Sequence, residues 1–139
     1  MDMITNTADE KSGSDKRTEK RKTGDAGEEI ACKYLLKKGY KIVERNYLCR
    51  SGEIDIIAID PKSHTLAFIE VKSRNTLAYG LPCQAVNRKK QRRIIASAEY
   101  YLLCNPRFNI FKLRFDIVEI LRLNEEVYIR HLLNAYTKR

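Results

Sequence analysis

Residues 52–72 read GEIDIIAIDPKSHTLAFIEVK, and this stretch decides the predicted fold. Both halves are rich in β-branched and apolar residues, as strands are, and the PKSH sequence at 61–64 is typical of a hairpin connection. Polar residues interrupt both predicted strands, because Asp55 lies in the first and Glu70 and Lys72 lie in the second. Side chains two apart on a strand point to the same face. Glu70 and Lys72 are therefore expected to share one face of a sheet.

Pairing of the two strands across this turn brings Asp55 to the face that holds Glu70 and Lys72. Two carboxylates and an ammonium on an otherwise apolar sheet are costly to bury without compensation. A bound divalent cation is the simplest compensation, and it makes this face a candidate metal site. The spacing alone fits a second interpretation equally well, an edge strand whose charged side chains face solvent and discourage pairing with another chain.

The composition indicates one globular domain with a polyanionic partner. The chain has 139 residues, of which 43% are hydrophobic, and a net charge of +9; this length suffices for a single core. Such an excess of positive charge favours nucleic acid, or less often an anionic membrane, as the partner. No apolar run approaches the roughly 18–20 residues that a membrane span needs, and the N-terminal residues are charged rather than signal-like. We therefore expect a cytoplasmic protein that binds no membrane.

The chain is expected to divide into a polar tail and one α/β domain. Residues 1–23 are mixed in charge with almost no large apolar residue, so they cannot offset the entropy of ordering and are predicted to be disordered. The domain, residues 24–139, begins with a helix over 24–38, whose apolar residues recur at helical spacing and which ends at Gly39. Glu28 is one of three acids in its first turn, where acids complement the helix macrodipole.

Alternating apolar residues and turn signals divide the rest of the domain. We expect strands at 41–50, 52–60, 66–72, 113–120 and 127–133, a loop at 73–84, and a helix at 85–103 that Pro106 ends. The predicted order is helix, three strands, helix, two strands. This order gives an α/β fold with a mixed five-stranded sheet flanked by helices.

The second predicted helix begins with a dense run of positive charge. Five of the six residues at 88–93 are Lys or Arg, and they extend most of the way round the helix. The run favours contact with a phosphate backbone, although a charged helix face that is merely solvated has the same composition. The predicted nucleic-acid-binding residues are Arg88, Lys89, Lys90, Gln91, Arg92, Arg93 and, from the second hairpin strand's end, Arg74.

Phosphodiester hydrolysis is a chemistry that these residues can perform. It needs hard oxygen ligands for a divalent cation, and a positive group that neutralises the charge developing on phosphorus oxygens. Asp55 and Glu70 are suitable ligands for Mg²⁺ or Mn²⁺. Lys72 is the candidate for orienting the attacking water or stabilising the developing charge.

A series of motifs, taken in order, resembles those of the YraN family. They are GxxGE at 24–28, GY at 39–40, GEIDIIA at 52–58, FIEVKSR at 68–74, KQRRI at 90–94, RFD at 114–116 and NAY at 134–136. The family looks like the PD-(D/E)xK nuclease superfamily, near the archaeal Holliday-junction resolvases. The resemblance implies a restriction-endonuclease-like fold.

The resemblance also implies roles for particular residues. Asp55 matches the motif aspartate of the superfamily, and Glu70 with Lys72 matches its Glu-x-Lys, although Ile54 stands where the superfamily's name has proline. Glu28 matches the acid that reaches the metal site from the first helix, so we expect it to be a further metal ligand.

Two later motifs receive weaker assignments from the same resemblance. Lys90 and Gln91 match residues of the following helix that approach the site or the DNA in related nucleases. Asp116 recurs without an assigned chemistry, and its expected role is at most to anchor Arg114 or a neighbouring strand.

Two hypotheses follow for the function. The first is a Mg²⁺- or Mn²⁺-dependent DNA endonuclease, with selectivity for junction-like DNA, serving repair or recombination; junction-cutting enzymes suggest a homodimer by analogy. The second is a catalytically silent nucleic-acid-binding module on the same fold. A third class, an interaction protein whose basic surface meets an acidic partner or a membrane, leaves the convergence of Asp55, Glu70 and Lys72 unexplained.

Overall fold

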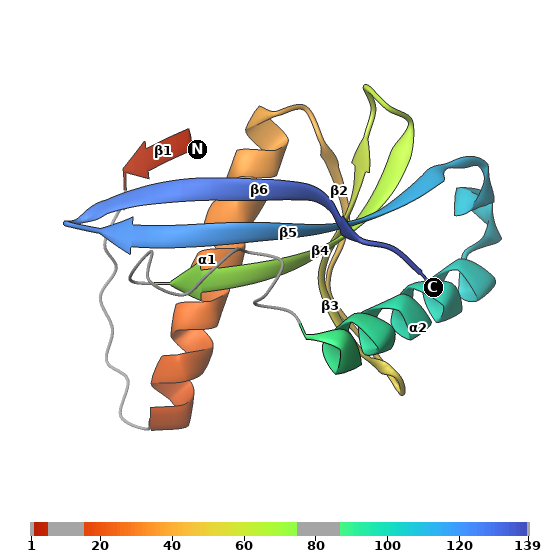
Figure 1. Cartoon of the computed structure of the whole chain (residues 1–139), viewed down its shortest axis with the longest axis horizontal. Coiled ribbons are helices and arrows are strands. Elements are labelled where there is room, and N and C mark those ends of the chain that lie inside the picture. Colours follow the sequence, from red (N-terminus) through yellow and green to blue (C-terminus); the bar gives the residue numbers. More distant parts are fainter. Residues whose placement is uncertain (1, 6–15, 75–86, 139) are drawn as a thin grey trace.

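The structure, a computed structural model, describes residues 2–5, 16–74 and 87–138, and it describes side chains from residue 26 onward. Its elements are β1 (Asp2–Thr5), α1 (Lys16–Lys37), β2 (Lys41–Cys49), β3 (Gly52–Asp60), β4 (Thr65–Arg74), α2 (Arg88–Cys104), a 3₁₀ helix η2 (Pro106–Ile110), β5 (Lys112–Leu123) and β6 (Glu126–Tyr136) (Figure 1). From α1 onward, their order is the predicted α-β-β-β-α-β-β. The prediction of an α/β fold with a mixed sheet is confirmed.

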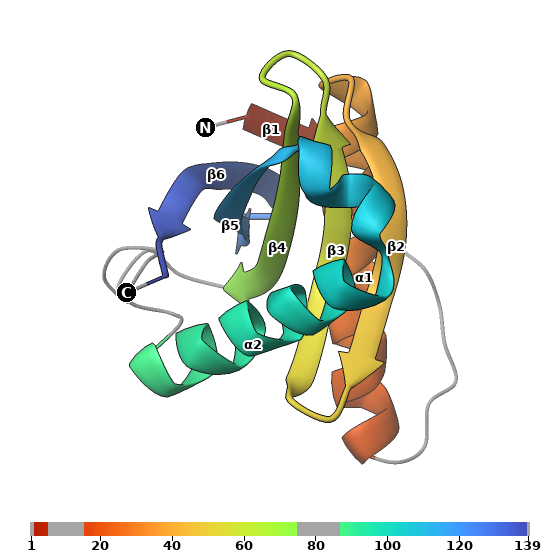
Figure 2. The same cartoon turned by 90° about the vertical axis from the view of Figure 1, so that its right-hand side faces the viewer.

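The sheet has the strand order β1-β6-β5-β4-β3-β2. Pairing is parallel between β4 and β5 and antiparallel at the other four junctions. The helices cover opposite faces of this sheet, and α2 crosses the strands obliquely (Figure 2). The parallel strands β4 and β5 are joined by a crossover connection that contains α2. Parallel neighbours need such a connection, and its helix lies against one face of the sheet.

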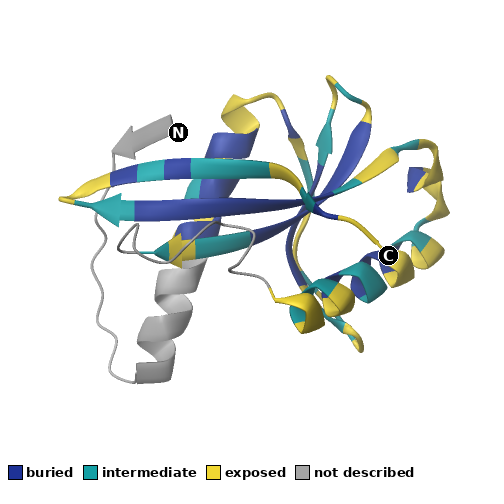
Figure 3. Ribbon diagram, in the orientation of Figure 1, coloured by how far each residue is buried: buried dark blue, intermediate teal, exposed yellow. Residues whose placement is uncertain are grey.

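Alternation along the strands creates two apolar cores, one under each helix. In β4, Ile69 packs in the core with α1, whereas Leu66 and Phe68 pack in the core with Ile94 of α2. Buried residues run through the middle strands, and the ends of α2 are exposed (Figure 3). Because Glu70 follows Phe68 by two residues, the alternation places its side chain on the face that α2 covers.

The N-terminal part extends the predicted architecture. A sixth strand, β1, pairs antiparallel with β6 from Asp2 opposite Ile129 to Thr5 opposite Glu126. Backbone pairing with an edge strand needs no long apolar pattern, which explains why four residues at the start of a mostly polar segment did not predict it. Helix α1 begins at Lys16 rather than at 24, through a run of Lys, Arg and Glu that favours helix. The rest of the predicted tail, and most of the predicted loop at 73–84, lie outside the described residues.

The ends of the two helices follow the sequence signals. Gly39 adopts a φ of 91° and ends α1, and the Tyr40 N–H donates to the Leu35 carbonyl at 2.9 Å. At the start of α2, the Asn87 side chain accepts from the Lys90 N–H at 2.9 Å. No helix in the described part of the chain is long and apolar enough to cross a membrane.

Candidate functional site

Asp55 and Glu70 meet where β3 and β4 begin to separate. The last backbone pair of this ladder joins Ile56 to Ile69, so the same register places Asp55 opposite Glu70. The Val71 N–H donates to Asp55 Oδ2 at 2.8 Å, so the carboxylate accepts a hydrogen bond at the point where backbone pairing stops. Asp55 is 8% exposed and Glu70 is 5% exposed. The hairpin therefore brings the two predicted ligands together, nearly buried, on the face of the sheet beside α2.

The environment of Asp55 disfavours its charge. Burial and, to a smaller extent, the facing Glu70 carboxylate raise the pKa of Asp55 to about 8, against the opposing hydrogen bond from the Val71 N–H. The charge of Glu28 and a hydrogen bond shared with Glu70 act in the same upward direction. Asp55 consequently holds a proton at neutral pH when no cation is bound. A divalent cation, which oxygen ligands of this kind bind, can take the place of that proton.

Two lysines contact the Glu70 carboxylate from different elements. Lys90 on α2 places its Nζ 2.7 Å from Glu70 Oε2, and Lys72 on β4 places its Nζ 3.8 Å from the same oxygen. Burial, and then the charge of Lys90, lower the pKa of Lys72. Burial also opposes the charge of Lys90, but its hydrogen bond to Glu70 and the Glu70 charge outweigh burial and raise its pKa. The two lysines together provide the positive charge that faces Glu70.

Glu28 comes from α1 on the opposite side of the sheet. Helix α1 approaches β4 closely at Gly27, where an added Cβ would lie 2.5 Å from Ser73 Oγ, so a larger residue would require the Ser73 hydroxyl to move. Glu28 is 9% exposed and its charge acts on Asp55. Among the described residues, no three carboxylate, imidazole or thiol side chains are grouped so that they could hold one metal ion. In this arrangement, Asp55 and Glu70 form a two-carboxylate site that Glu28 influences through its charge.

A hollow of about 490 Å³ opens above the two carboxylates. Asp55 and Glu70 line it from the hairpin strands, which we call its floor, and Lys89, Lys90 and Arg93 line it from the first turns of α2, which we call its wall. The donor set of the floor, two carboxylate groups, fits Mg²⁺ or Mn²⁺. The wall fits the phosphate groups of a nucleic acid. We call this hollow, with its floor and wall, the carboxylate hollow.

The predicted nucleic-acid-binding residues do not lie on one surface. Three of them line the carboxylate hollow, while Arg88, Gln91 and Arg92 line a separate groove on another side of α2. Arg74 is 10% exposed, and its Nε lies 2.5 Å from Oε2 of Glu119, which is fully buried. Arg130 holds the other oxygen of Glu119 at 2.6 Å. Arg74 therefore joins β4 to β5 through an internal ion pair rather than facing solvent.

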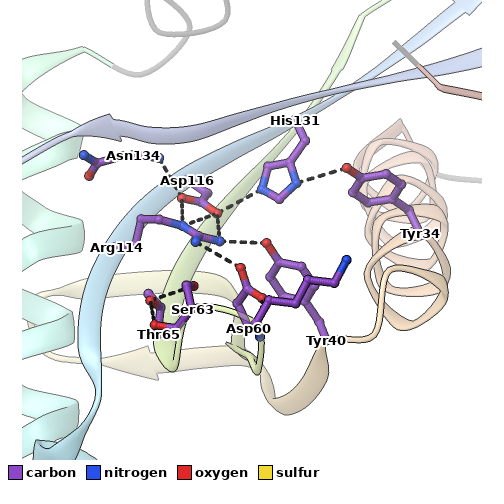
Figure 4. Close-up of polar contacts among 10 residues, drawn as sticks. Tyr34, Tyr40, Asp60, Ser63, Thr65, Arg114, Asp116, His131 and Asn134 are labelled. Atoms are coloured by element: carbon purple, nitrogen blue, oxygen red, sulfur yellow. Dashed lines mark hydrogen bonds and ion pairs between the residues drawn. The ribbon is translucent and has the colours of Figure 1, made fainter.

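A second cluster of buried polar residues centres on Arg114 (Figure 4). Its Nε donates to Asp116 Oδ1 at 2.9 Å, and its other nitrogens reach Tyr40 Oη at 2.7 Å and Asp60 Oδ2 at 3.2 Å. Asp116 is fully buried and Arg114 is 13% exposed. The expected role of Asp116, anchoring Arg114, is what this geometry shows. The name Arg114 cluster is used below for Arg114, Asp116, Tyr40 and Asp60 together with His131 and Asn134.

His131 and Asn134 supply the remaining hydrogen bonds to the Asp116 carboxylate. His131 Nε2 lies 2.9 Å from Asp116 Oδ2, and the Asn134 N–H donates to Oδ1 at 2.8 Å. The other ring nitrogen of His131 contacts the Tyr34 hydroxyl at 3.1 Å. Burial alone would raise the pKa of Asp116, but the hydrogen bonds from His131, Arg114 and the Asn134 N–H hold it below its usual value. The cluster therefore joins α1, β5 and β6 and leaves no room for a substrate at Asp116.

Sequence reasoning missed most partners in these clusters. The two-residue spacing of Arg114 and Asp116 predicts a shared strand face, and it is the one local signal for that cluster. His131 and Glu119 have no such signal, because the residues they contact lie far away in the chain or on another strand. The contact of Lys90 with Glu70 also joins distant segments, and only the resemblance of the second helix pointed to it.

Comparisons with known proteins identify relatives over most of the chain. The model of the family described as "Uncharacterised protein family UPF0102" matches residues 27–120. A UPF0102 protein of Clostridioides difficile is 43% identical over 116 residues, which are 84% of this chain and 97% of the relative. One of Caldanaerobacter subterraneus is 40% identical over 124 residues, 87% of this chain and 99% of the relative. One of Trichlorobacter lovleyi is 44% identical over 114 residues, 81% of this chain and 88% of the relative.

Proposed function

This chain belongs to the UPF0102 (YraN) family, as its motifs predicted, and because the family's description assigns no activity we propose one from the carboxylate hollow. We propose that the protein is a divalent-metal-dependent DNA endonuclease that hydrolyses phosphodiester bonds. Asp55 and Glu70 would hold Mg²⁺ or Mn²⁺, and the basic residues of α2 would hold the DNA.

One observation carries this proposal: two nearly buried carboxylates face each other beneath a basic wall. Burial and, to a smaller extent, the facing Glu70 carboxylate raise the pKa of Asp55 to about 8, which supports a pair that favours a bound proton or another cation over two negative charges. Such a pair binds a hard divalent cation in place of a proton. A phosphate group that enters the hollow would also meet the basic residues of α2 that line it.

The roles of the residues follow from their positions. When bound, such a cation would lower the pKa of the attacking water and stabilise negative charge on the phosphate oxygens. Lys72 lies on the same strand face as Glu70, 3.8 Å from its carboxylate. Its lowered pKa suits a group that must orient water and exchange a proton. Lys89, Lys90 and Arg93 bind the phosphates on either side of the reacting bond.

A second function, a catalytically silent nucleic-acid-binding module, is favoured by the contact of Lys90 with Glu70. At 2.7 Å, this ammonium supplies internally part of the positive charge that a metal ion would bring. A protein of this kind would bind nucleic acid through the same basic wall. Its affinity would fall steeply with salt, and no metal-dependent turnover would occur.

Cleavage of a panel of labelled substrates distinguishes the two functions. The panel contains duplex, single-stranded, flap and four-way-junction DNA, with Mg²⁺ or Mn²⁺, and compares wild type with Glu70→Gln and Lys72→Met. Glu29→Gln is the matched control, because Glu29 is an exposed acid beside Glu28 on α1. An endonuclease loses activity by about 100-fold or more in the two site variants and keeps it in the control. Binding without cleavage by wild type would support the silent module.

The same panel tests the finer parts of the proposal. Preferential cleavage of the four-way junction would establish junction selectivity, whereas equal cleavage of duplex would contradict it. Sedimentation with junction DNA present then tests the homodimer, since symmetric cutting of two strands is expected to need two copies. A strict monomer on the junction would argue against a resolvase role.

A further inference from the structure

A groove runs along α2 on a different side from the carboxylate hollow. It consists of two adjoining hollows of about 780 and 370 Å³, which share Ile95, Glu99, Thr137 and Lys138. The chain after β6 forms part of both hollows, and Figure 1 shows this C-terminal segment approaching α2. We call the two hollows together the α2–β6 groove.

The two ends of the α2–β6 groove differ in chemistry. Arg88, Gln91 and Arg92 line one end, in the first half of α2. The other end is mainly aliphatic, with lining residues that include Leu102, Leu103, Pro106 and Leu113. Leu103 is 79% exposed, and Leu113, which lines the same end of the groove, is 46% exposed. Large apolar side chains exposed together beside charged ones are characteristic of interaction sites rather than of ordinary protein surface.

The charges of the groove favour an acidic ligand. Of the described residues that line it, Glu99 is the one acid, and its carboxylate is paired with Lys138. Within the described residues, neither Arg88 nor Arg92 has an acidic side chain within ion-pair distance. The two arginines are four residues apart and so project from the same side of the helix. Guanidinium groups in this arrangement can each bind a carboxylate through two parallel hydrogen bonds.

We propose that the α2–β6 groove binds an acidic peptide segment of a partner protein, whose carboxylates pair with Arg88 and Arg92 and whose apolar side chains fill the aliphatic end. Single-stranded nucleic acid fits less well, because its bases stack on exposed aromatic rings. Among the described residues, the one aromatic side chain that lines the groove, Phe115, is only 8% exposed. A second copy also fits less well, because each copy carries a net charge of +9. The inference does not depend on the endonuclease proposal.

Helix α2 thereby has two basic sides with different partners. Lys89 and Arg93 face the carboxylate hollow, and Arg88 and Arg92 face the α2–β6 groove. Each pair consists of two cations one turn apart. Replacing either pair with two glutamates therefore changes the net charge of the helix by the same amount. The two double variants are therefore matched controls for each other.

Fluorescence anisotropy with the full chain tests the proposal. The probe is a fluorescein-labelled peptide of four aspartates followed by Leu-Ala-Leu-Phe, measured in 150 mM NaCl so that charges further apart than about 8 Å are screened. Saturable binding is expected, weakened about tenfold or more in Arg88→Glu/Arg92→Glu and in Leu103→Asp. Lys89→Glu/Arg93→Glu should stay within about twofold of wild type. A peptide with asparagine at the four aspartate positions should bind at least about tenfold more weakly.

Three outcomes would overturn the proposal. One is that the labelled acidic peptide shows no binding even at 1 mM protein. Another is that the two double variants lose peptide affinity equally, which would mean that the peptide is attracted by net charge alone. The third is binding of a twelve-residue oligothymidine that Leu103→Asp abolishes, because nucleic acid would then be the occupant of the groove. Leu103 is so exposed that its replacement should leave folding intact, which circular dichroism checks.

Discussion

Asp55 and Asp116 are two nearly buried aspartates in one sheet, and their pKa values move in opposite directions. Burial pushes the pKa of each upward. Asp116 accepts hydrogen bonds from Arg114, His131 and a backbone N–H, and these hold its pKa below the usual value. For Asp55, burial together with the facing Glu70 carboxylate outweighs the one backbone N–H that it accepts, so its pKa rises to about 8. The partners of a buried carboxylate, rather than its burial, decide whether it is charged.

The difference separates a structural cluster from a candidate functional site. In the Arg114 cluster the acids have partners within the protein, because Arg114 contacts both Asp116 and Asp60 and His131 contacts Asp116. In the carboxylate hollow, the acids at the floor share two half-buried lysines, and the space above them is open. A site of that kind has capacity for a charged ligand. Variants at each location test whether this contrast is correct.

The largest expected effect comes from removing the central cation of the structural cluster. Arg114→Met leaves Asp116 and Asp60 without their main partner in the interior, so the free energy of unfolding should fall by about 3–5 kcal/mol. Urea denaturation at pH 7 measures it. Lys90→Met is the control, since its side chain is 42% exposed and water can replace it at Glu70; it should cost less than about 1 kcal/mol. Equal losses would mean that the two clusters do not differ.

The pH dependence of stability should have opposite sign for the two aspartates. Because the pKa of Asp55 is higher in the folded protein, its stabilising protonated form is fully present below about pH 4 and is lost as pH rises toward 8. Wild type should therefore lose up to about 1.4 kcal/mol per pH unit relative to Asp55→Asn between pH 5 and 7. The side-chain carbonyl in Asp55→Asn can still accept the hydrogen bond from the Val71 N–H, so the variant removes the titrating group and keeps this contact. A constant difference across this range would contradict the raised pKa of Asp55.

Asp116 provides the reversed control in the same titration. Its folded pKa is lowered, so the stability that it contributes is present above its unfolded pKa, near 4, and is lost as pH falls through the folded value. The advantage of wild type over Asp116→Asn should shrink only in acid. If the stability difference from wild type followed the same pH dependence in Asp55→Asn and Asp116→Asn, the proposed contrast between the two aspartates would be wrong.

A smaller effect is expected from the lysine that contacts the floor of the carboxylate hollow. Lys90→Met removes a positive charge 2.7 Å from Glu70 Oε2, which repels and competes with a metal ion. The affinity of the DNA-free protein for Mn²⁺ should rise about tenfold, which corresponds to about 1.4 kcal/mol. Electron paramagnetic resonance of free Mn²⁺ measures this affinity. Weaker binding would show that Lys90 supports the metal ion rather than opposing it.

The smallest effect should come from an ion pair outside both clusters. Arg45 and Glu29 lie 3.0 Å apart, with side chains 36% and 53% exposed. Arg45→Ala should lower the free energy of unfolding by less than about 1 kcal/mol, with most of the loss removed by salt. Urea denaturation at low and high salt measures it. A loss as large as that of Arg114→Met would show that burial contributes nothing to the contrast.

The sequence predicted the parts of the fold that depend on local pattern. Alternation placed the five strands of the domain, and the hairpin at residues 61–64 set the register that brings Asp55 opposite Glu70. Gly39 and Pro106 marked the ends of the two helices. These features are predictable because each is decided by residues within one turn or one strand of one another.

Long-range pairing is what the sequence could not predict. Strand β1 pairs with residues more than 120 positions away, and Tyr34 contacts His131 across 97 positions. The partition of the basic residues of α2 between two surfaces was also hidden, because it depends on where the C-terminal segment passes. A charge run in a sequence shows that cations are present, but only the packing of neighbouring elements shows what each one faces.

Calorimetric titration of Mn²⁺ into the DNA-free protein at pH 7 tests the central claim most directly. The claim is that the carboxylate hollow holds a proton that a divalent cation replaces. Measured in two buffers of different ionisation enthalpy, wild type should bind Mn²⁺ and release close to one proton, because the pKa of Asp55 is about 8. Asp55→Asn should show neither the binding heat nor the proton. Binding without proton release, or no binding by wild type, would contradict the account.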